Sequence, residues 1–547
     1  MNTIKNILLS FTLFLGLYGV FAQTENPVIS AIQKEVDRNH TELKMEGMMP
    51  PFFISYTVFE IYSYSLSASL GTMNNYNASH TRRGLPRMLV GDYHRNTANV
   101  VGGRSVSPVL TSLNDNATGI PLTIWRGLDD LYKNTVEQYK TRMAILQQQT
   151  LTKEEEALLD FEQVAPVNMI LQPIPVNFDR IFWENYLRKA SETAKQYPEI
   201  LSSQVSLNVI NIMAYTYNTE GSRYAVPTTV YQLRFNANTR AEDGQELTHT
   251  LYTENATFEQ MPKIETYINE CKTLMENLLK LKNAPVIDEA YSGPVLLEGK
   301  AVEWLFRQTF FYNNRLYAAP KTISLNPNQQ QGSDGNDFEM MLNKKVISRS
   351  ITIKSITGQE FYKGQRLNGY YPIDFEGVVP DKELVLIEDG VLRNLLNGRS
   401  PTKKIPHSNG HIRYDLNSNN FGIFPGNILI TCNQIFSKEE LRKKLIEAAK
   451  EEDLEYAYII HDIFLNLISK IYVADGREEL VRGATVSDLS LRTFKRILGA
   501  SNKEQIWSYG ETQMTLVYPD ALLFEEMDIT RMPNIEFKKP YIVPKPK

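Results

Sequence analysis

Two histidines, His407 and His411, have the spacing at which a pair of imidazoles could bind a metal ion. Residues four apart lie on one face of an α-helix, and a helical histidine pair of this kind is a common set of zinc ligands. The residues between them, Ser408, Asn409 and Gly410, are typical of a turn, so the helical geometry is not expected. We predict a loop that is exposed or lines a cleft, and Asn409 and His411 are candidate cleft-lining residues.

Two carboxylates, Asp374 and Glu376, lie two residues apart in a run that predicts a strand over 371–378. Alternate residues of a strand share one face, which is the arrangement that paired carboxylates in acid–base catalysis need. The alternative is a solvated strand edge, and we favour it. Both residues remain candidates for the lining of a cleft.

Cys432 and His411 could form a thiol nucleophile with its base. Nothing in the sequence places them close together, and the apolar run 428–430 favours a buried, unreactive thiol. His461 and Asp462 follow another apolar run and are expected at the edge of the core. The sequence lacks the patterns for phosphate binding, dinucleotide binding, the serine-hydrolase elbow and dithiol redox chemistry. The catalytic residues are therefore unknown, and no metal ligands are assigned.

Neighbouring elements must position such candidates, and the stretch 293–311 in mid-chain is the clearest of these elements. The apolar run 295–297, set between a proline and a glycine, predicts a buried strand. Glu303 and Arg307 are expected as an i,i+4 ion pair on the solvent-facing side of the helix that follows. Glu298 lies at the junction, where a helix N-terminus offers unpaired N–H groups, and is another candidate cleft-lining residue. The predicted inner face of that helix consists of Val302, Leu305, Phe306 and Phe310.

The chain of 547 residues is longer than one hydrophobic core normally serves, so two domains are expected and three are possible. Its content of 42% hydrophobic and 22% charged residues is ordinary for a globular protein. The formal charge is −5 and the pI is near 6.0, and no dense Lys/Arg run occurs. Nucleic acid is therefore not an expected partner.

The first 22 residues have the layout of a cleaved secretory signal. Lys5 precedes the apolar run 7–20, and Val20 and Ala22 place small residues before the expected cut. We expect a mature protein that begins near Gln23 and is exported, either to a periplasm or beyond it; an uncleaved anchor is the alternative. No later apolar run has spanning length, so we expect no membrane span after signal cleavage. Two cysteines do not make a disulfide framework, and we favour separate core thiols over a pair.

The succession of predicted elements indicates an α+β fold. Residues 27–284 are expected to form an N-terminal domain in which helices pack on an antiparallel sheet, with an inserted helical hairpin at about 128–162. Residues 291–537 are expected to form a β-rich C-terminal domain with a few helices. Residues 538–547 are expected as an extended tail.

Local sequence patterns predict where some of these helices and strands begin and which residues face inward. Thr152 and Ser437 each precede a glutamate by three residues, which predicts two capping boxes at helix starts. The runs 52–62 and 64–70 predict two strands, joined as a hairpin. A helix is expected over 178–197, with an inner face made of Phe178, Ile181, Phe182, Tyr186 and Leu187.

Five segments occur in the order seen in the TldD/PmbA metallopeptidase family, also called modulators of gyrase, and the chain resembles that family. They are GPVLLEG (293–299), DFEGVVP (374–380), LIEDGVLRNLLNGR (386–399), SNGHIR (408–413) and IYVADGREELVRGA (471–484). In the first half, YNTEG (217–221) and the stretch 87–97 resemble the N-terminal domain of the family. The predicted helical hairpin looks like an addition to it.

The resemblance implies a zinc site that this sequence lacks. The family's active branch binds zinc through His-Glu-x-x-x-His on a helix and through a cysteine near the C-terminus. When that helix is laid on the central stretch, the first ligand falls on Glu298, the general base on Gly299 and the second ligand on Val302. Glycine and valine can neither bind zinc nor accept a proton. Residues 501–527 contain no cysteine, so the third ligand is missing too.

The resemblance therefore implies the family branch without zinc, which can pair with a zinc-bearing relative. We expect an exported, non-catalytic subunit or peptide-binding partner, without a cofactor of its own. A homo- or hetero-oligomer is possible, and unfolded peptide is a possible ligand. Two alternatives remain: an active, divergent metallopeptidase that uses other ligands, such as Glu298 with His411, and a cell-envelope interaction module.

Overall fold

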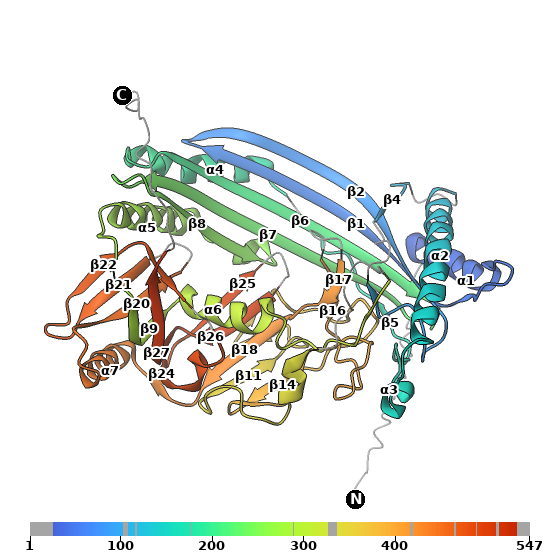
Figure 1. Ribbon diagram of the computed structural model, residues 1–547. Coiled ribbons are helices and arrows are strands. Elements are labelled where there is room, and N and C mark those ends of the chain that lie inside the picture. Colours follow the sequence, from blue (N-terminus) through green and yellow to red (C-terminus); the bar gives the residue numbers. More distant parts are fainter. Residues whose placement is uncertain are drawn as a thin grey trace, which may run out of the picture.

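The computed structural model describes residues 26–101, 108–114, 118–176, 178–287, 289–325, 336–415, 420–463, 467–487, 490–509 and 514–532. These residues form a mixed α+β structure, which confirms the predicted fold class. A large antiparallel sheet with helices arches over two smaller sheets built from the second half of the chain (Figure 1). The predicted signal segment and the predicted tail lie outside the described residues.

The N-terminal sheet owes its size to four long strands, β1, β2, β6 and β7, and all of these except β2 are rich in aromatic and β-branched residues. Its strand order is β4-β2-β1-β6-β7-β5, and β8 also pairs with β7. All of its pairings are antiparallel except that between β5 and β7. The strands are β1 (Pro51–Ser69), β2 (Thr72–Val90), β4 (Val109–Leu110), β5 (Asn168–Ile170), β6 (Ser202–Asn218), β7 (Arg223–Arg240) and β8 (Glu246–Asn255).

The two strands predicted at 52–62 and 64–70 are one strand, β1. The prediction was wrong because β2 and β6 pair with β1 on both sides without a break around Ser63, which joins the two apolar runs. The hairpin turn instead lies at Leu70 and Gly71, where both backbones have positive φ, 50° and 78°. The turn therefore connects β1 to β2.

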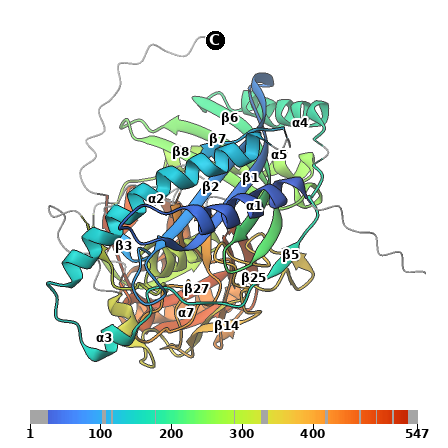
Figure 2. The ribbon, with the colours of Figure 1, turned by 90° about the vertical axis from the view of Figure 1, so that its right-hand side faces the viewer.

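Helices cover one face of this sheet at its two ends (Figure 1). At one end, α1 (Pro27–Glu42) and α2 (Gly119–Leu146) lie side by side, as Figure 2 shows, and share a core with Ile54, Tyr56 and Val58 of β1. At the other end, α4 (Arg180–Glu192) and α5 (Ile264–Lys282) pack on Leu66 and Ala68 of the same strand. The even-numbered residues of β1 thus face the helices, as the period-two alternation of a strand requires.

Two helical predictions need correction. In α4 the buried residues include Trp183, Tyr186 and Leu187, whereas Ile181 and Phe182 are 73% and 43% exposed, although both were expected inside. The helix after the capping box at Thr152, α3 (Lys153–Ala157), ends four residues before the expected Phe161. The capping box itself is confirmed, and so is the one at Ser437, which opens α7 (Lys438–Glu451).

The second half of the chain contains two sheets with a common core. The larger has the order β19-β24-β27-β9-β20-β21-β22, and β23 pairs with β27. Its strands are β9 (Tyr291–Glu298), β19 (Ile435–Phe436), β20 (Tyr456–Asp462), β21 (Leu467–Tyr472), β22 (Glu478–Val481), β23 (Ala484–Val486), β24 (Ile497–Ser501) and β27 (Ala521–Arg531).

The smaller sheet has the order β15-β14-β11-β18-β26-β25. Its strands are β11 (Ile351–Ser355), β14 (Leu384–Glu388), β15 (Val391–Leu392), β18 (Asn427–Cys432), β25 (Glu504–Tyr509) and β26 (Met514–Pro519). Three short pairs complete the β structure: β3 (Val100–Val101) with β10 (Ile323–Ser324), β12 (Phe361–Tyr362) with β13 (Gln365–Arg366), and β16 (Ile412–Asp415) with β17 (Asn420–Ile423).

The central stretch lies in the middle of the larger sheet. Strand β9 is bordered by β27 and β20, and its residues Val295 to Leu297 are almost fully buried. Gly299 then turns the chain into α6 (Lys300–Phe306), which continues as a π-helical segment, Arg307–Tyr312. The predicted inner face of this helix is confirmed, because its four apolar residues belong to the common core of the two sheets. None of the helices in the described ranges is long and apolar enough to cross a membrane.

Candidate functional site

The junction between β9 and α6 is where the sequence predicts a site. Gly299 has φ 55° and ψ −123°, a conformation that a residue with a side chain rarely adopts. Its N–H donates to the carbonyl oxygen of Asp520 at 2.8 Å. The carboxylate of the preceding residue, Glu298, is 12% exposed and lies at the edge of the junction.

Glu298 has charged partners from two other elements. Its Oε2 lies 3.1 Å from Nδ1 of His461 on β20, and its Oε1 lies 3.7 Å from Nε of Arg442 on α7. Burial alone would raise the pKa of Glu298, but the hydrogen bond from His461 and the charges of Arg442 and Lys438 outweigh burial and lower it. Lys438 also pairs with Asp520 at 2.5 Å. The carboxylates at this junction are therefore neutralised by neighbouring cations.

The donor groups at this junction do not fit a catalytic zinc ion. Glu298 and His461 supply one carboxylate and one imidazole, whereas such a site needs three protein ligands. Val302, at the second ligand position, is fully buried in the core, and Arg442 would place a positive charge next to the metal. Within the described residues, no three His, Cys, Asp or Glu side chains come together in a way that could hold a metal ion.

Glu303 and Arg307 form an ion pair that is buried and not solvent-facing, so the prediction of an exposed pair was wrong. Their side chains are 1% and 6% exposed, and Nε of Arg307 donates to Oε1 of Glu303. The rings of Tyr312 and Trp507 lie 5.0 and 5.6 Å from the guanidinium carbon of Arg307. Burial raises the pKa of Glu303 to about 7, although the charges of Arg307 and Lys300 oppose the shift.

Arg307 also borders a cavity of about 690 Å³ at the far end of the same helix. The walls are mainly aromatic and apolar, and Arg307 is the one cation among the described lining residues. Its lining consists of Arg307, Phe311, Tyr312, Asn313, Asn314, Tyr317, Ala318, Ala319, Asn336, Asp337, Gly422, Ile423, Phe424, Pro425 and Met514. A volume of this size suits a small ligand or a few residues of a peptide. None of the five candidate cleft-lining residues borders this cavity.

Asp374 and Glu376 lie in a buried turn, so the predicted strand and the favoured solvated edge were both wrong. They are 1% and 4% exposed. The carboxylate of Asp374 accepts N–H bonds from Glu376, Val378 and Ile412 at 2.9 to 3.1 Å, which fixes the turn. Burial, followed by the charge of Glu376, raises the pKa of Asp374 to about 7.

Glu376 instead joins a network around Arg399, which is fully buried. Its carboxylate accepts from the backbone N–H of Arg399 at 2.6 Å and pairs with Arg87 of β2 at 2.6 Å. The guanidinium of Arg399 pairs with Glu220 at 2.6 Å and lies 4.0 Å from the ring centre of Phe161. These contacts connect the two halves of the chain.

His411 and Asn409 lie in a loop, as predicted for this segment, but His411 is 1% exposed. Its Nε2 lies 3.0 Å from Oγ of Ser355, and its Nδ1 lies 2.8 Å from Oδ1 of Asn409. This row of groups resembles a serine–histidine–amide triad, yet burial leaves no path for a substrate. Burial lowers the pKa of His411 to about 3, so the ring is neutral. Cys432 is half-buried and separate from His411, and both cysteines are free.

The comparison with known protein families covers the part of the chain that contains the site residues. Residues 292–531 match the family model described as the PmbA/TldA metallopeptidase C-terminal domain. This C-terminal part of the chain therefore matches the TldD/PmbA family. The matched range contains all five candidate residues together with Arg307 and His461.

Three solved structures share the fold of this chain. A modulator of DNA gyrase from Thermotoga maritima, described as putative, is 16% identical with a TM-score of 0.59, and the match covers 91% of this chain and all of that chain. TldE from Thermococcus kodakarensis is 10% identical with a TM-score of 0.55 and the same coverage. A second such modulator of DNA gyrase, from Bacteroides thetaiotaomicron, is 12% identical with a TM-score of 0.57, covering 92% and 98%. No match to a curated protein was found.

Three residues that the structure places at these sites were not identified from the sequence. His461 was assigned to the edge of the core, but the pairing of β20 with β9 brings it to Glu298. Arg307 was assigned to solvent, and Arg399 was not singled out. Tyr312 is close to Arg307 in the sequence, but Trp507 is not, so the aromatic surroundings that favour a buried guanidinium could not be recognised from the sequence.

Proposed function

We propose that this chain is an exported, non-catalytic subunit of the TldD/PmbA type that binds peptide and pairs with a zinc-bearing relative. The observation that carries the proposal is the junction at Glu298, Gly299 and Val302: Glu298 and His461 supply one carboxylate and one imidazole, and within the described residues no three His, Cys, Asp or Glu side chains come together to hold a metal ion. The cavity beside Arg307 supports peptide binding, because apolar walls with few polar groups suit peptide side chains. The family resemblance supports the zinc-bearing partner.

Metal content tests the non-catalytic role. The chain from Gln23 onward, purified and dialysed, should contain far less than one zinc ion per chain and should not hydrolyse unfolded peptide. The matched pair of variants is Glu298→Ala at the junction and Glu388→Ala, an exposed glutamate with 53% side-chain exposure. Stoichiometric zinc that is retained by the wild type and by the Glu388 variant but lost with Glu298→Ala would overturn the proposal.

That outcome would favour the second candidate function, a divergent metallopeptidase. The hydrogen bond between Glu298 and His461 is the observation behind it, since these are the two groups at the junction that could bind a metal. His461→Ala should then remove the metal as Glu298→Ala does. The partner that the sequence suggested for Glu298, His411, is instead hydrogen-bonded to Ser355 and Asn409.

Complex formation tests the proposed partner. The chain should form a stable complex with a family member that carries His-Glu-x-x-x-His from the same organism, measured by size-exclusion chromatography with light scattering. Sequencing of the exported protein should give Gln23 as its first residue. A chain that binds neither that relative nor unfolded peptide would favour a cell-envelope interaction module.

A further inference from the structure

The cavity beside the π-helical segment is lined in a way that selects one kind of peptide group. Its apolar lining is contributed by Phe311, Tyr312, Tyr317, Phe424 and Met514 among others, and its positive charge by Arg307. Asp337 is the negative charge among the described lining residues and begins the 3₁₀-helix Asp337–Met341. A ligand that fits these walls has a large apolar side chain and one anionic group.

We propose that this cavity binds the C-terminal carboxylate of a peptide that ends in a large apolar residue, with Arg307 as the carboxylate-binding group. The inference deepens the proposed peptide-binding function and rests on it. A guanidinium presents two parallel N–H groups that match the two oxygens of a carboxylate. Tyr312 and Trp507 flank the guanidinium and fix its position, so little conformational freedom is lost on binding.

The carboxylate of Glu303 competes with a ligand carboxylate for the guanidinium of Arg307. It occupies the guanidinium with its own carboxylate, and the pair is removed from water. When Glu303 takes up a proton, its charge no longer competes with a ligand carboxylate for Arg307. The other charged and titratable groups around Glu303 are Lys300 on its own helix, Asp462 on β20 and Tyr518 on β26.

The pH dependence of binding follows from this competition. The pKa of Glu303 is about 7, whereas the C-terminal carboxylate of a peptide stays ionised throughout the neutral range. Binding of the carboxylate should therefore strengthen as the pH falls from about 8.5 to about 6. Glu303→Gln removes the competing charge and should give strong binding at both pH values. His249, which pairs with Asp462 at 3.7 Å, is unchanged in that variant. A pH dependence of binding that came from His249 would therefore persist in Glu303→Gln.

The experiment uses the full mature chain and a fluorescein-labelled alanine hexapeptide that ends in phenylalanine, as the free acid and as the amide. At about pH 6 the acid should bind about tenfold more tightly than the amide, because a charge-assisted bidentate contact is made only by the acid. Arg307→Met should remove this preference. Arg393→Met, in an exposed Arg–Glu pair, is the matched control and should keep it.

The outcomes separate this inference from the proposed function. Equal binding of the acid and the amide would overturn carboxylate recognition while leaving peptide binding intact. Absence of binding by either peptide would count against the proposed function itself. If Arg307→Met does not fold, Arg307→Lys keeps the charge without the planar fork, and an undiminished preference for the acid in that variant would overturn the role of the guanidinium.

Discussion

At the scale of single residues, the raised pKa of Glu303 leads to a prediction of how the free energy of unfolding depends on pH. Its pKa is about 7 in the folded chain and about 4.5 when the chain is unfolded. Because the folded state binds this proton more tightly, the contribution of Glu303 to stability is fully present below about pH 4.5 and is lost as the pH rises through about 7. The wild type should therefore lose up to about 3 kcal/mol of unfolding free energy between about pH 5 and pH 8 relative to Glu303→Gln.

The measurement is urea-induced unfolding of both proteins across that pH range. The quantity compared is the slope of the unfolding free energy against pH. The absolute free energies are not compared, because glutamine also changes the pairing of Arg307 at every pH. Glu388→Gln, at an exposed glutamate, should follow the wild-type slope. Parallel curves for the wild type and Glu303→Gln would show that Glu303 does not titrate between pH 5 and pH 8.

Residue-level expectations succeeded where the cause was local. The capping boxes at Thr152 and Ser437 depend on residues three positions apart, and both were predicted correctly. The burial of Glu303 and Arg307 depends on Trp507, which lies on a strand far along the chain. Helical periodicity marks the two positions as polar, and polar positions are usually solvated, so the sequence favoured the wrong environment.

At the scale of elements, the correct predictions are those in which a strand or helix is encoded by its own apolar pattern. The apolar run 295–297 lies in β9, as predicted, and the helix expected over 178–197 corresponds to α4 and the 3₁₀-helix Thr193–Gln196 that follows it. The candidate site was less predictable because it is assembled by pairing between distant strands. The parallel pairing of β20 with β9 brings His461 beside Glu298, and no spacing within the sequence reports such a pairing.

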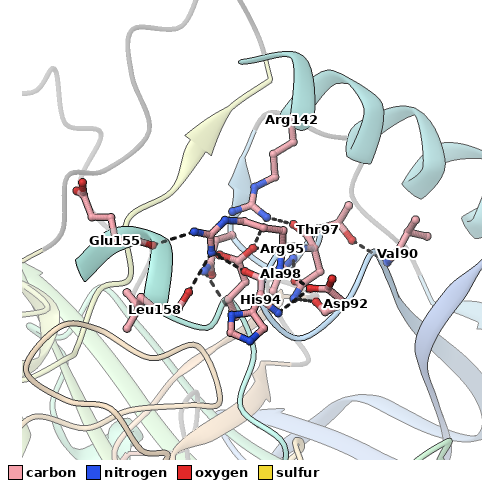
Figure 3. Close-up of polar contacts among 12 residues, drawn as sticks. Val90, Asp92, His94, Arg95, Thr97, Ala98, Arg142, Glu155 and Leu158 are labelled. Atoms are coloured by element: carbon pink, nitrogen blue, oxygen red, sulfur yellow. Dashed lines mark hydrogen bonds and ion pairs between the residues drawn. The ribbon is translucent and has the colours of Figure 1, made fainter. Parts of the chain in front are cut away.

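Element α3 is short and depends on one side chain for its C-terminal end. Arg95 donates to the carbonyl oxygens of Glu155, Glu156 and Leu158 at 2.9 to 3.1 Å. A helix of five residues leaves most of its carbonyl groups without helical partners, so these bonds replace the missing ones. Figure 3 shows Arg95 reaching Glu155 and Leu158, while Arg142 points from α2 into the turn that contains Asp92.

Replacement of Arg95 by methionine should therefore loosen α3 alone. Backbone amides of 153–157 should exchange with deuterium faster, by about tenfold or more, because each lost charge-assisted bond contributes on the order of 1.5–3 kcal/mol. Amides of 160–162 should keep their protection, since Arg142 still pairs with Asp160. Arg126→Met, at an exposed position of α2, is the control. Unchanged exchange in 153–157 would contradict the role of Arg95.

At the scale of the whole molecule, an aromatic cluster and a buried charge network are two of the contacts through which the two halves of the chain meet. Phe59 of β1 stacks on Tyr414 at 5.2 Å and contacts Phe375, so the face of the large sheet opposite its helices packs on the second half. The network around Arg399 adds a link from Glu220, between β6 and β7, to the turn of Glu376. The halves are thus held together by apolar packing and by a fully buried cation.

Substitution of Arg399 tests how far the contact between the two halves determines the stability of the molecule. Methionine at position 399 leaves the carboxylate of Glu220 buried without its cation, and removal of one partner from a buried pair costs about 3–5 kcal/mol. We expect calorimetry to show a lower melting temperature for Arg399→Met and two separate transitions, because the halves no longer unfold together. Adding Glu220→Gln should restore part of the loss, since Tyr93 can still hydrogen-bond to a neutral amide oxygen. Arg393→Met should melt like the wild type, and an Arg399→Met profile that matched it would show that Arg399 does not couple the two halves.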